Sequence, residues 1–142
     1  VSISNSNILD LYSGIGSFGI ECISRKAKKV TFVENNSLAE KTLKSNLKNL
    51  NITEKCEVFT NKTSIVIEKI KNRKFDLIFL DPPFADKLFI QDLSLINRHK
   101  IYSDEHLVVI HREKTDDFFI NSLKTIMTKK YGRSKIIFAK FI

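Results

Sequence analysis

The sequence predicts an α/β fold, in which an open, doubly wound, mostly parallel sheet is covered by helices on both faces. Three observations predict it. Strand-like and helix-like segments alternate along most of the 142 residues. The strand-like segments 77–80 and 107–110 are continuously apolar, as is typical of strands buried on both faces. A glycine-rich turn joins the first strand to the first helix, a connection common in parallel α/β sheets.

The individual elements follow from their apolar periodicity. Residues 8–12 form a short apolar run that ends in the glycine-rich turn, and Phe18, Cys22 and Ile23 then recur at helical spacing. Ser37 is predicted to be a helix N-cap, and Glu40 three residues later would complete a capping box. We therefore expect strands at 8–12, 30–33, 57–60, 75–80 and 106–111, and helices at 17–26, 37–50, 64–71 and 87–96.

The last part of the chain departs from this alternation. A short helix is expected over residues 116–123, followed by strands over 125–131 and 135–141 that the turn Gly132-Arg133-Ser134 joins. Such a pair predicts an antiparallel hairpin that closes the sheet. The length suits one core, and no linker or repeat interrupts it, so residues 1–142 are expected to form a single domain.

The composition favours an anionic partner. Lys and Arg number 24 against 16 Asp and Glu, a net charge of +8, which suits nucleic acid. Basic residues gather at 25–29, 69–74 and 129–133, although each cluster could also be ordinary solvated surface. The two cysteines lack metal-ligand spacing, so no metal and a reducing compartment are expected. Without a membrane-length apolar run or a leader pattern, we expect a soluble, cytoplasmic protein.

The tetrapeptide Asp81-Pro82-Pro83-Phe84 follows an apolar strand and is rich in hydrogen-bond acceptors. Neither proline has a backbone N–H, and each disfavours helical backbone in the residue before it. An exocyclic purine amine could donate to the Asp81 carboxylate and the Pro82 carbonyl while the base stacks on Phe84. The motif therefore predicts a site for amine methylation, and the alternative is a stiff loop with a capping aspartate.

A second motif supplies a cofactor site. Gly14, Gly16 and Gly19 form G-x-G-x-x-G, and Glu34 lies 20 residues after Gly14, where a carboxylate can accept from ribose hydroxyls. A nicotinamide cofactor would use the same features. Asp10 argues against it, because a carboxylate beside the turn would repel a pyrophosphate but tolerate a cationic sulfonium. The alternative for Asp10 is a carboxylate that caps nearby backbone amides.

Taken together, these segments resemble a known family. With D-L-Y-S-G-I-G-S-F-G-I-E at 10–21, Val33-Glu34 and F-D-L-I-F-L-D-P-P-F at 75–84, the chain resembles the class I S-adenosylmethionine-dependent methyltransferases. More narrowly, it is similar to the bacterial RsmD-type guanine-N2 methyltransferases of small-subunit ribosomal RNA. The similarity runs over residues 7–142 and includes Tyr131-Gly132-Arg133. It implies a Rossmann-like, seven-stranded sheet with a reversed last strand.

The resemblance also implies where S-adenosylmethionine binds. Asp10 and the backbone of residues 13–16, with Ser13, Gly14 and Gly16, would lie near its methionine part. Glu34 would bind the ribose. The adenine edge would lie near Asn61 or Lys62, where relatives commonly carry Asp or Asn followed by a small residue.

Two departures from the family are expected to matter. Members carry an N-terminal extension with an Arg-Pro-Thr element, whereas this sequence starts almost at the first strand, so we expect a domain without that extension. Relatives often carry an acid near His111. A lone histidine at a strand end is more often structural than catalytic, which is our interpretation of His111.

The expected function is transfer of a methyl group from S-adenosylmethionine to the N2 amine of a guanine in 16S ribosomal RNA, with Asp81, Pro82, Pro83 and Phe84 as the catalytic residues. The expected partner is ribosomal RNA or a partly assembled small subunit, bound by a monomer. Three alternatives stay open: a DNA adenine-N6 methyltransferase, an NAD-dependent dehydrogenase, and a non-catalytic RNA-binding scaffold.

Overall fold

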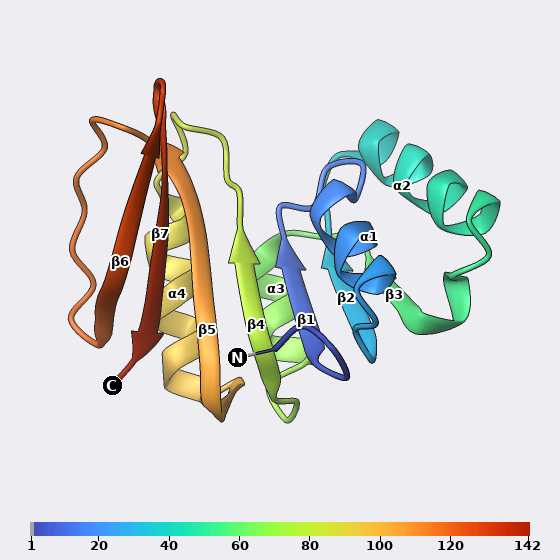
Figure 1. The fold of residues 1–142 in the computed structure, drawn as a ribbon, viewed down its shortest axis with the longest axis horizontal. Helices are drawn as coiled ribbons and strands as arrows, with labels where there is room; N and C mark the ends of the chain where they lie inside the picture. The colour runs from blue at the N-terminus through green and yellow to red at the C-terminus, as the bar shows by residue number, and fades with distance from the viewer. Residues whose placement is uncertain (1) are drawn as a thin grey trace.

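A computed structural model describes residues 2–142 and places seven strands in one sheet with helices on both faces (Figure 1). The strand order is β3-β2-β1-β4-β5-β7-β6. Neighbouring strands from β3 to β5 pair in parallel, and β7 pairs antiparallel with both β5 and β6. The predicted fold class, including the antiparallel C-terminal hairpin, is confirmed.

The elements alternate up to the fifth strand, as the periodicity predicted. The strands are β1 (Asn7–Leu11), β2 (Lys29–Val33), β3 (Cys56–Phe59), β4 (Phe75–Leu80), β5 (Tyr102–Glu113), β6 (Leu123–Tyr131) and β7 (Ser134–Phe141). The helices are α1 (Ser17–Ser24), α2 (Ser37–Asn49), α3 (Thr63–Lys69) and α4 (Leu88–His99), with a short 3₁₀ turn η1 (Thr53–Lys55). None of these helices is both long and apolar enough to cross a membrane.

Two apolar clusters hold the helices against the sheet. Alternate residues of a strand point to opposite faces, so Leu9 and Ile78 join the cluster beneath α3 and α4, whereas Ile8 and Leu77 join the cluster beneath α1 and α2. Phe32 is fully buried and packs against Gly19, where an added Cβ would lie 2.3 Å from the phenyl ring. Only glycine therefore fits this position of α1 without displacement of the ring.

The start of α2 differs from the prediction. The N-cap is Asn36, whose side-chain oxygen accepts a hydrogen bond from the Ala39 N–H at 2.9 Å. Ser37 is the first residue of the helix, and Glu40 pairs with Lys44 instead of closing a capping box. The prediction was wrong by one residue because Asn36 offers an equally good capping oxygen at the preceding position.

The short helix expected over residues 116–123 is absent, and most of this segment has no regular secondary structure. Its side chains are bound by distant partners instead. The Asp116 carboxylate accepts from Arg112 and Lys87, and Phe118 packs edge-to-face on Phe89 with ring centroids 5.0 Å apart. Ile120 is buried, so contacts with α4 and the sheet decide the path of the segment.

Candidate active site

A cleft of about 770 Å³ opens at the carboxyl ends of the parallel strands. Its walls come from the ends of β2, β4 and β5, from the start of α3 and from α4. In open α/β sheets, ligands bind at this edge, where the connections diverge to opposite faces. The lining includes Glu34, Lys62 and all four residues Asp81, Pro82, Pro83 and Phe84. The fold thus brings Glu34 and the loop after β4 together around one space, whereas Gly14, Gly16 and Gly19 lie outside the lining.

Glu34 connects the glycine turn with the start of α2. Its Oε1 atom accepts from the Gly14 N–H at 2.6 Å, and its Oε2 atom accepts from the Asn36 N–H at 2.9 Å. Gly14 has a positive φ of 58°, and a Cβ placed there would meet no atom within 4 Å. Gly16, with φ 91°, is packed against Leu43. The turn therefore presents open backbone at Gly14 while Gly16 packs against α2.

Asp10 lies beneath this turn and does not line the cleft. Its Oδ2 atom accepts from the Gly19 N–H at 3.2 Å, which matches the capping alternative raised by the sequence. Its Oδ1 atom is buried and has no hydrogen-bond partner within residues 2–142. Burial raises the pKa of Asp10 to about 8, partly opposed by the Gly19 hydrogen bond. Burial therefore favours the neutral, protonated form of this carboxyl group.

The other residues predicted for the cofactor are divided between the cleft and its surroundings. Ser13 lies outside the lining, where its hydroxyl donates to the Asp10 carbonyl at 2.6 Å and accepts from the Val33 N–H at 3.0 Å. Asn61 also lies outside the lining and accepts from the Lys62 N–H at 2.8 Å. Lys62 itself is exposed and lines the cleft at the N-terminus of α3.

Asp81 is paired with His111 across the end of the sheet. The Nδ1 atom of His111 lies 2.7 Å from Asp81 Oδ1, and the His111 ring meets Phe84 with centroids 5.4 Å apart. Asp81 Oδ2 has no hydrogen-bond partner among residues 2–142, so one oxygen of the carboxylate can accept from a ligand. The sequence did not predict this pair, because the two residues are 30 positions apart.

Behind the loop lies Arg112, which is fully buried. Its guanidinium donates to the Pro83 carbonyl at 3.2 Å, to the Phe84 carbonyl at 2.8 Å and to Asp116 at 2.7 Å. It lies 4.3 Å from the centre of the Phe89 ring. A buried cation thus holds the loop after β4 in its conformation. Sequence analysis missed this residue, although an arginine within the otherwise apolar strand β5 was a signal that could have identified it.

Arg112 adds hydrogen-bond donors to a loop whose two prolines have no backbone N–H. Its Nη1 atom also lies 3.5 Å from the Pro82 carbonyl oxygen, a long contact. A carbonyl oxygen has two lone pairs, so Pro82 can still accept from a ligand. The Pro83 and Phe84 carbonyls already accept short hydrogen bonds from the protein. Of the loop's acceptors, Asp81 is therefore the one best placed for a ligand amine.

The opposite wall was not predicted at all. Tyr12 lines the cleft and donates its hydroxyl hydrogen bond to Asp92, whose pKa burial raises. Asp86 is a further acid of the lining. Together with Glu34 and Asp81, these residues make the cleft acidic, which suits a cationic ligand and opposes a pyrophosphate. Within residues 2–142, no cluster of three His, Cys, Asp or Glu side chains could hold a metal ion.

Comparison with protein families and curated proteins shows what the chain is similar to. A family model described as "Conserved hypothetical protein 95" matches residues 1–140. A ribosomal RNA small subunit methyltransferase D of Buchnera aphidicola is 34% identical over 128 residues, which are 90% of this chain and 66% of the relative. The protein of the same name from Haemophilus influenzae is 34% identical over 130 residues, 90% of this chain and 67% of the relative. The chain thus spans about two thirds of the length of these relatives.

Solved structures share the fold. A putative methylase from Haemophilus influenzae superposes with a TM-score of 0.86 at 31% identity, covering 96% of this chain and 87% of that one. A putative methyltransferase solved as a complex with SAH has a TM-score of 0.81 at 11% identity, covering 97% and 46%, which shows the fold alone. From the nearly complete family match, the chain belongs to the Conserved hypothetical protein 95 family, the RsmD-type methyltransferases that its motifs predicted.

Proposed function

We propose that the chain transfers a methyl group from S-adenosylmethionine to the N2 amine of a guanine in small-subunit ribosomal RNA. The observation that carries the proposal is the Asp81 carboxylate, which lines the same cleft as Glu34 and keeps one oxygen free for an amine. The names of the relatives favour ribosomal RNA over the DNA adenine alternative. The acidic lining disfavours a nicotinamide dinucleotide with its pyrophosphate.

The residues at the cleft fit the cofactor. When bound, S-adenosylmethionine supplies an activated methyl group on a cationic sulfonium. Each Glu34 oxygen accepts one backbone hydrogen bond and keeps a lone pair for a ribose hydroxyl. Gly14 offers unobstructed backbone, and Lys62 lines the cleft where the adenine is expected. Asp10 does not contact the cofactor site directly. It accepts a hydrogen bond from the Gly19 N–H and so fixes the orientation of α1.

The base is oriented by the loop after β4. Asp81 accepts a hydrogen bond from the amine and favours its pyramidal form, in which the nitrogen lone pair is localised. The same carboxylate stabilises the positive charge that develops on nitrogen, and Asp81 or water then takes the proton. Phe84 is exposed and can stack on the base, a contact of roughly 1–3 kcal/mol. The guanine must be unpaired or flipped to enter the cleft.

Replacing Glu34 by Ala should weaken cofactor binding. The substitution removes the acceptor for the ribose and leaves the N–H groups of Gly14 and Asn36 without their side-chain partner. Isothermal titration calorimetry with S-adenosylmethionine should show a dissociation constant raised about tenfold or more, on the scale of a lost charged hydrogen bond. An unchanged dissociation constant would contradict the role of Glu34. Glu54→Ala, on the exposed η1 turn, is the control.

Replacing His111 should slow turnover without affecting cofactor binding. Without its Nδ1 partner, Asp81 is free to rotate, and misplacement of a catalytic group lowers kcat about 10- to 100-fold. His111→Asn keeps a side-chain donor close to the position of Nδ1 and should retain more activity than His111→Ala. The matched control is His99→Ala, which breaks a similar pair with Glu68 at 2.9 Å on the outside of the sheet. Equal activity of all three variants would show that His111 does not position Asp81.

The substrate assay compares radiolabelled methyl transfer to unmodified small subunits, naked 16S ribosomal RNA and DNA. Nucleoside analysis of the product should give N2-methylguanosine. N6-methyladenine in DNA would replace the proposal by the DNA alternative, and no transfer to any substrate would favour a binding scaffold.

We further propose that the chain acts as a monomer in the cytoplasm, which sedimentation and cell fractionation test.

A further inference from the structure

Positive charge is concentrated at the C-terminal end of the sequence. Residues 118–142 contain no Asp or Glu and six basic residues, so this segment carries +6 of the net charge of +8. The rest of the chain holds 18 basic and all 16 acidic side chains, a net of +2. The six basic residues are Lys124, Lys129, Lys130, Arg133, Lys135 and Lys140. We call the pair β6–β7, with the turn between its strands, the basic hairpin.

The basic hairpin forms the free edge of the sheet. Every residue of β6 from Lys124 to Tyr131 is exposed, as is Arg133 in the turn. Within the described residues, neither Lys129, Lys130 nor Arg133 forms an ion pair. The exposed side chains include Met127 and Tyr131, which are 46% and 60% accessible. Unpaired cations beside exposed apolar and aromatic side chains are the pattern that single-stranded nucleic acid binds.

The strand register places this surface next to the cleft. His111 pairs with Ile136, and Ile136 pairs with Lys129, so these three side chains lie in one row on the same face of the sheet. Two strand spacings separate His111 from Lys129, a distance of about 10 Å. Figure 1 shows no helix of the described chain in front of β5, β7 and β6 on this face. An open surface therefore runs from His111, the partner of Asp81, to the edge strand β6.

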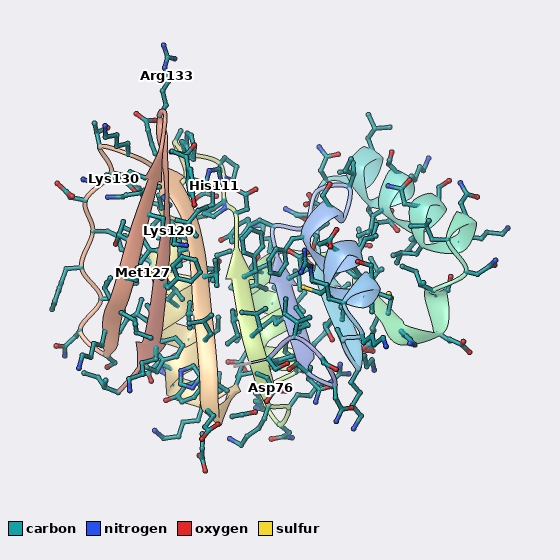
Figure 2. The ribbon with its side chains drawn as sticks, in the orientation of Figure 1. Asp76, His111, Met127, Lys129, Lys130 and Arg133 are labelled. Carbon is teal, nitrogen blue, oxygen red and sulfur yellow. The ribbon has the colours of Figure 1, made fainter. Side chains whose placement is uncertain are left out.

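The turn of the hairpin extends the same surface. Arg133 is joined to the strand of His111, since its carbonyl accepts from the Lys114 N–H at 2.7 Å. Figure 2 shows Arg133 projecting beyond the sheet at the same end as His111, whereas Asp76 lies at the opposite end of β4. Lys129, Lys130 and Arg133 therefore lie toward the end of the sheet where the cleft opens, with Lys129 on the face of His111 and Lys130 on the opposite face of the edge strand.

The cleft itself cannot hold the RNA backbone. Glu34, Asp81, Asp86 and Asp92 line it, and phosphates would be repelled there, whereas an uncharged base can enter. We propose that the basic hairpin binds the phosphate backbone beside the target guanine, with Lys129, Lys130 and Arg133 as its phosphate contacts. This proposal rests on the methyltransferase function proposed above. Met127 and Tyr131 are the side chains on which neighbouring bases would stack.

The other occupant to consider is a protein strand added to the edge of β6. Lysines on an edge strand oppose such pairing, because they repel the same strand of a second copy and keep the edge solvated. RNA binding requires no added strand, and each lysine can contribute a favourable contact with a phosphate. The distribution of charge therefore favours RNA.

The test measures binding of an unmodified 16S ribosomal RNA fragment by the triple variant K129Q/K130Q/R133Q. We expect the dissociation constant in 0.1 M salt to rise at least tenfold. The slope of log K against log salt concentration should fall by about 2, because each phosphate contact contributes about 0.7 for a single strand. The matched control K48Q/K55Q/K69Q removes three exposed lysines of α2, η1 and α3 and should bind within twofold of the original chain.

Two results would overturn the proposal: wild-type affinity and salt slope in the hairpin variant, or an equal loss in the control. Sedimentation provides a further check, since a hairpin variant that loses only self-association would make the edge a protein interface. Binding does not require turnover, so the two proposals can fail separately. A chain that binds RNA through the hairpin but transfers no methyl group would remove the proposed function and leave the docking surface in place.

Discussion

Asp81→Asn is expected to abolish methyl transfer while cofactor affinity stays within about twofold of the original chain. The amide keeps the size of the side chain but removes the negative charge, which stabilises the developing positive charge on the amine. Loss of such electrostatic stabilisation typically costs about 10²–10³ in kcat. The measurement is single-turnover transfer from labelled S-adenosylmethionine to 16S ribosomal RNA, with cofactor binding followed by calorimetry.

Asp117→Asn provides the control, because it removes the same charge from a fully exposed side chain. It should leave turnover unchanged. Near-normal transfer by Asp81→Asn would remove Asp81 from the mechanism. A loss of cofactor affinity as large as the loss of turnover would instead assign Asp81 to cofactor binding. Asp81→Asn should still bind RNA, which separates this prediction from the docking proposal.

Arg112→Met is expected to destabilise the fold by about 3–5 kcal/mol, because it removes one partner of a buried ion pair and leaves the carbonyls of Pro83 and Phe84 without their donors. Methionine preserves most of the packing against Phe89. The free energy of unfolding from urea denaturation measures the effect. Arg98→Met, an exposed residue of α4, should change that free energy by less than about 0.5 kcal/mol.

A double variant tests whether the ion pair causes the effect. In Arg112→Met with Asp116→Asn, no buried charge is left unpaired, so the loss should be smaller than the sum of the two single losses. Arg112→Lys keeps the charge but cannot reach several acceptors with one ammonium, so it should restore only part of the stability. Strict additivity would show that Arg112 and Asp116 act independently.

The sequence predictions were correct where a feature depends on residues close together in the chain, and wrong where it depends on contacts between distant segments. The glycine turn and Glu34 were predictable because a turn that requires positive φ and a carboxylate at the end of the next strand lie within one strand–helix–strand unit. The hairpin was predictable from two strand-like segments around Gly132. The helix over residues 116–123 was wrong because its acidic and aromatic residues bind Arg112 and Phe89, which local periodicity does not reveal.

The sequence by itself determined the alternation of strands and helices, the glycine turn with its acidic partner and the acceptor-rich loop after β4, since each depends on neighbouring residues. Only the tertiary structure decided that His111 holds Asp81, that Arg112 holds the loop from behind and that Asp10 stays beneath the turn. The physical reason is that these contacts join strands that are distant in the chain, and their register is set by burial of the whole sheet rather than by any one segment.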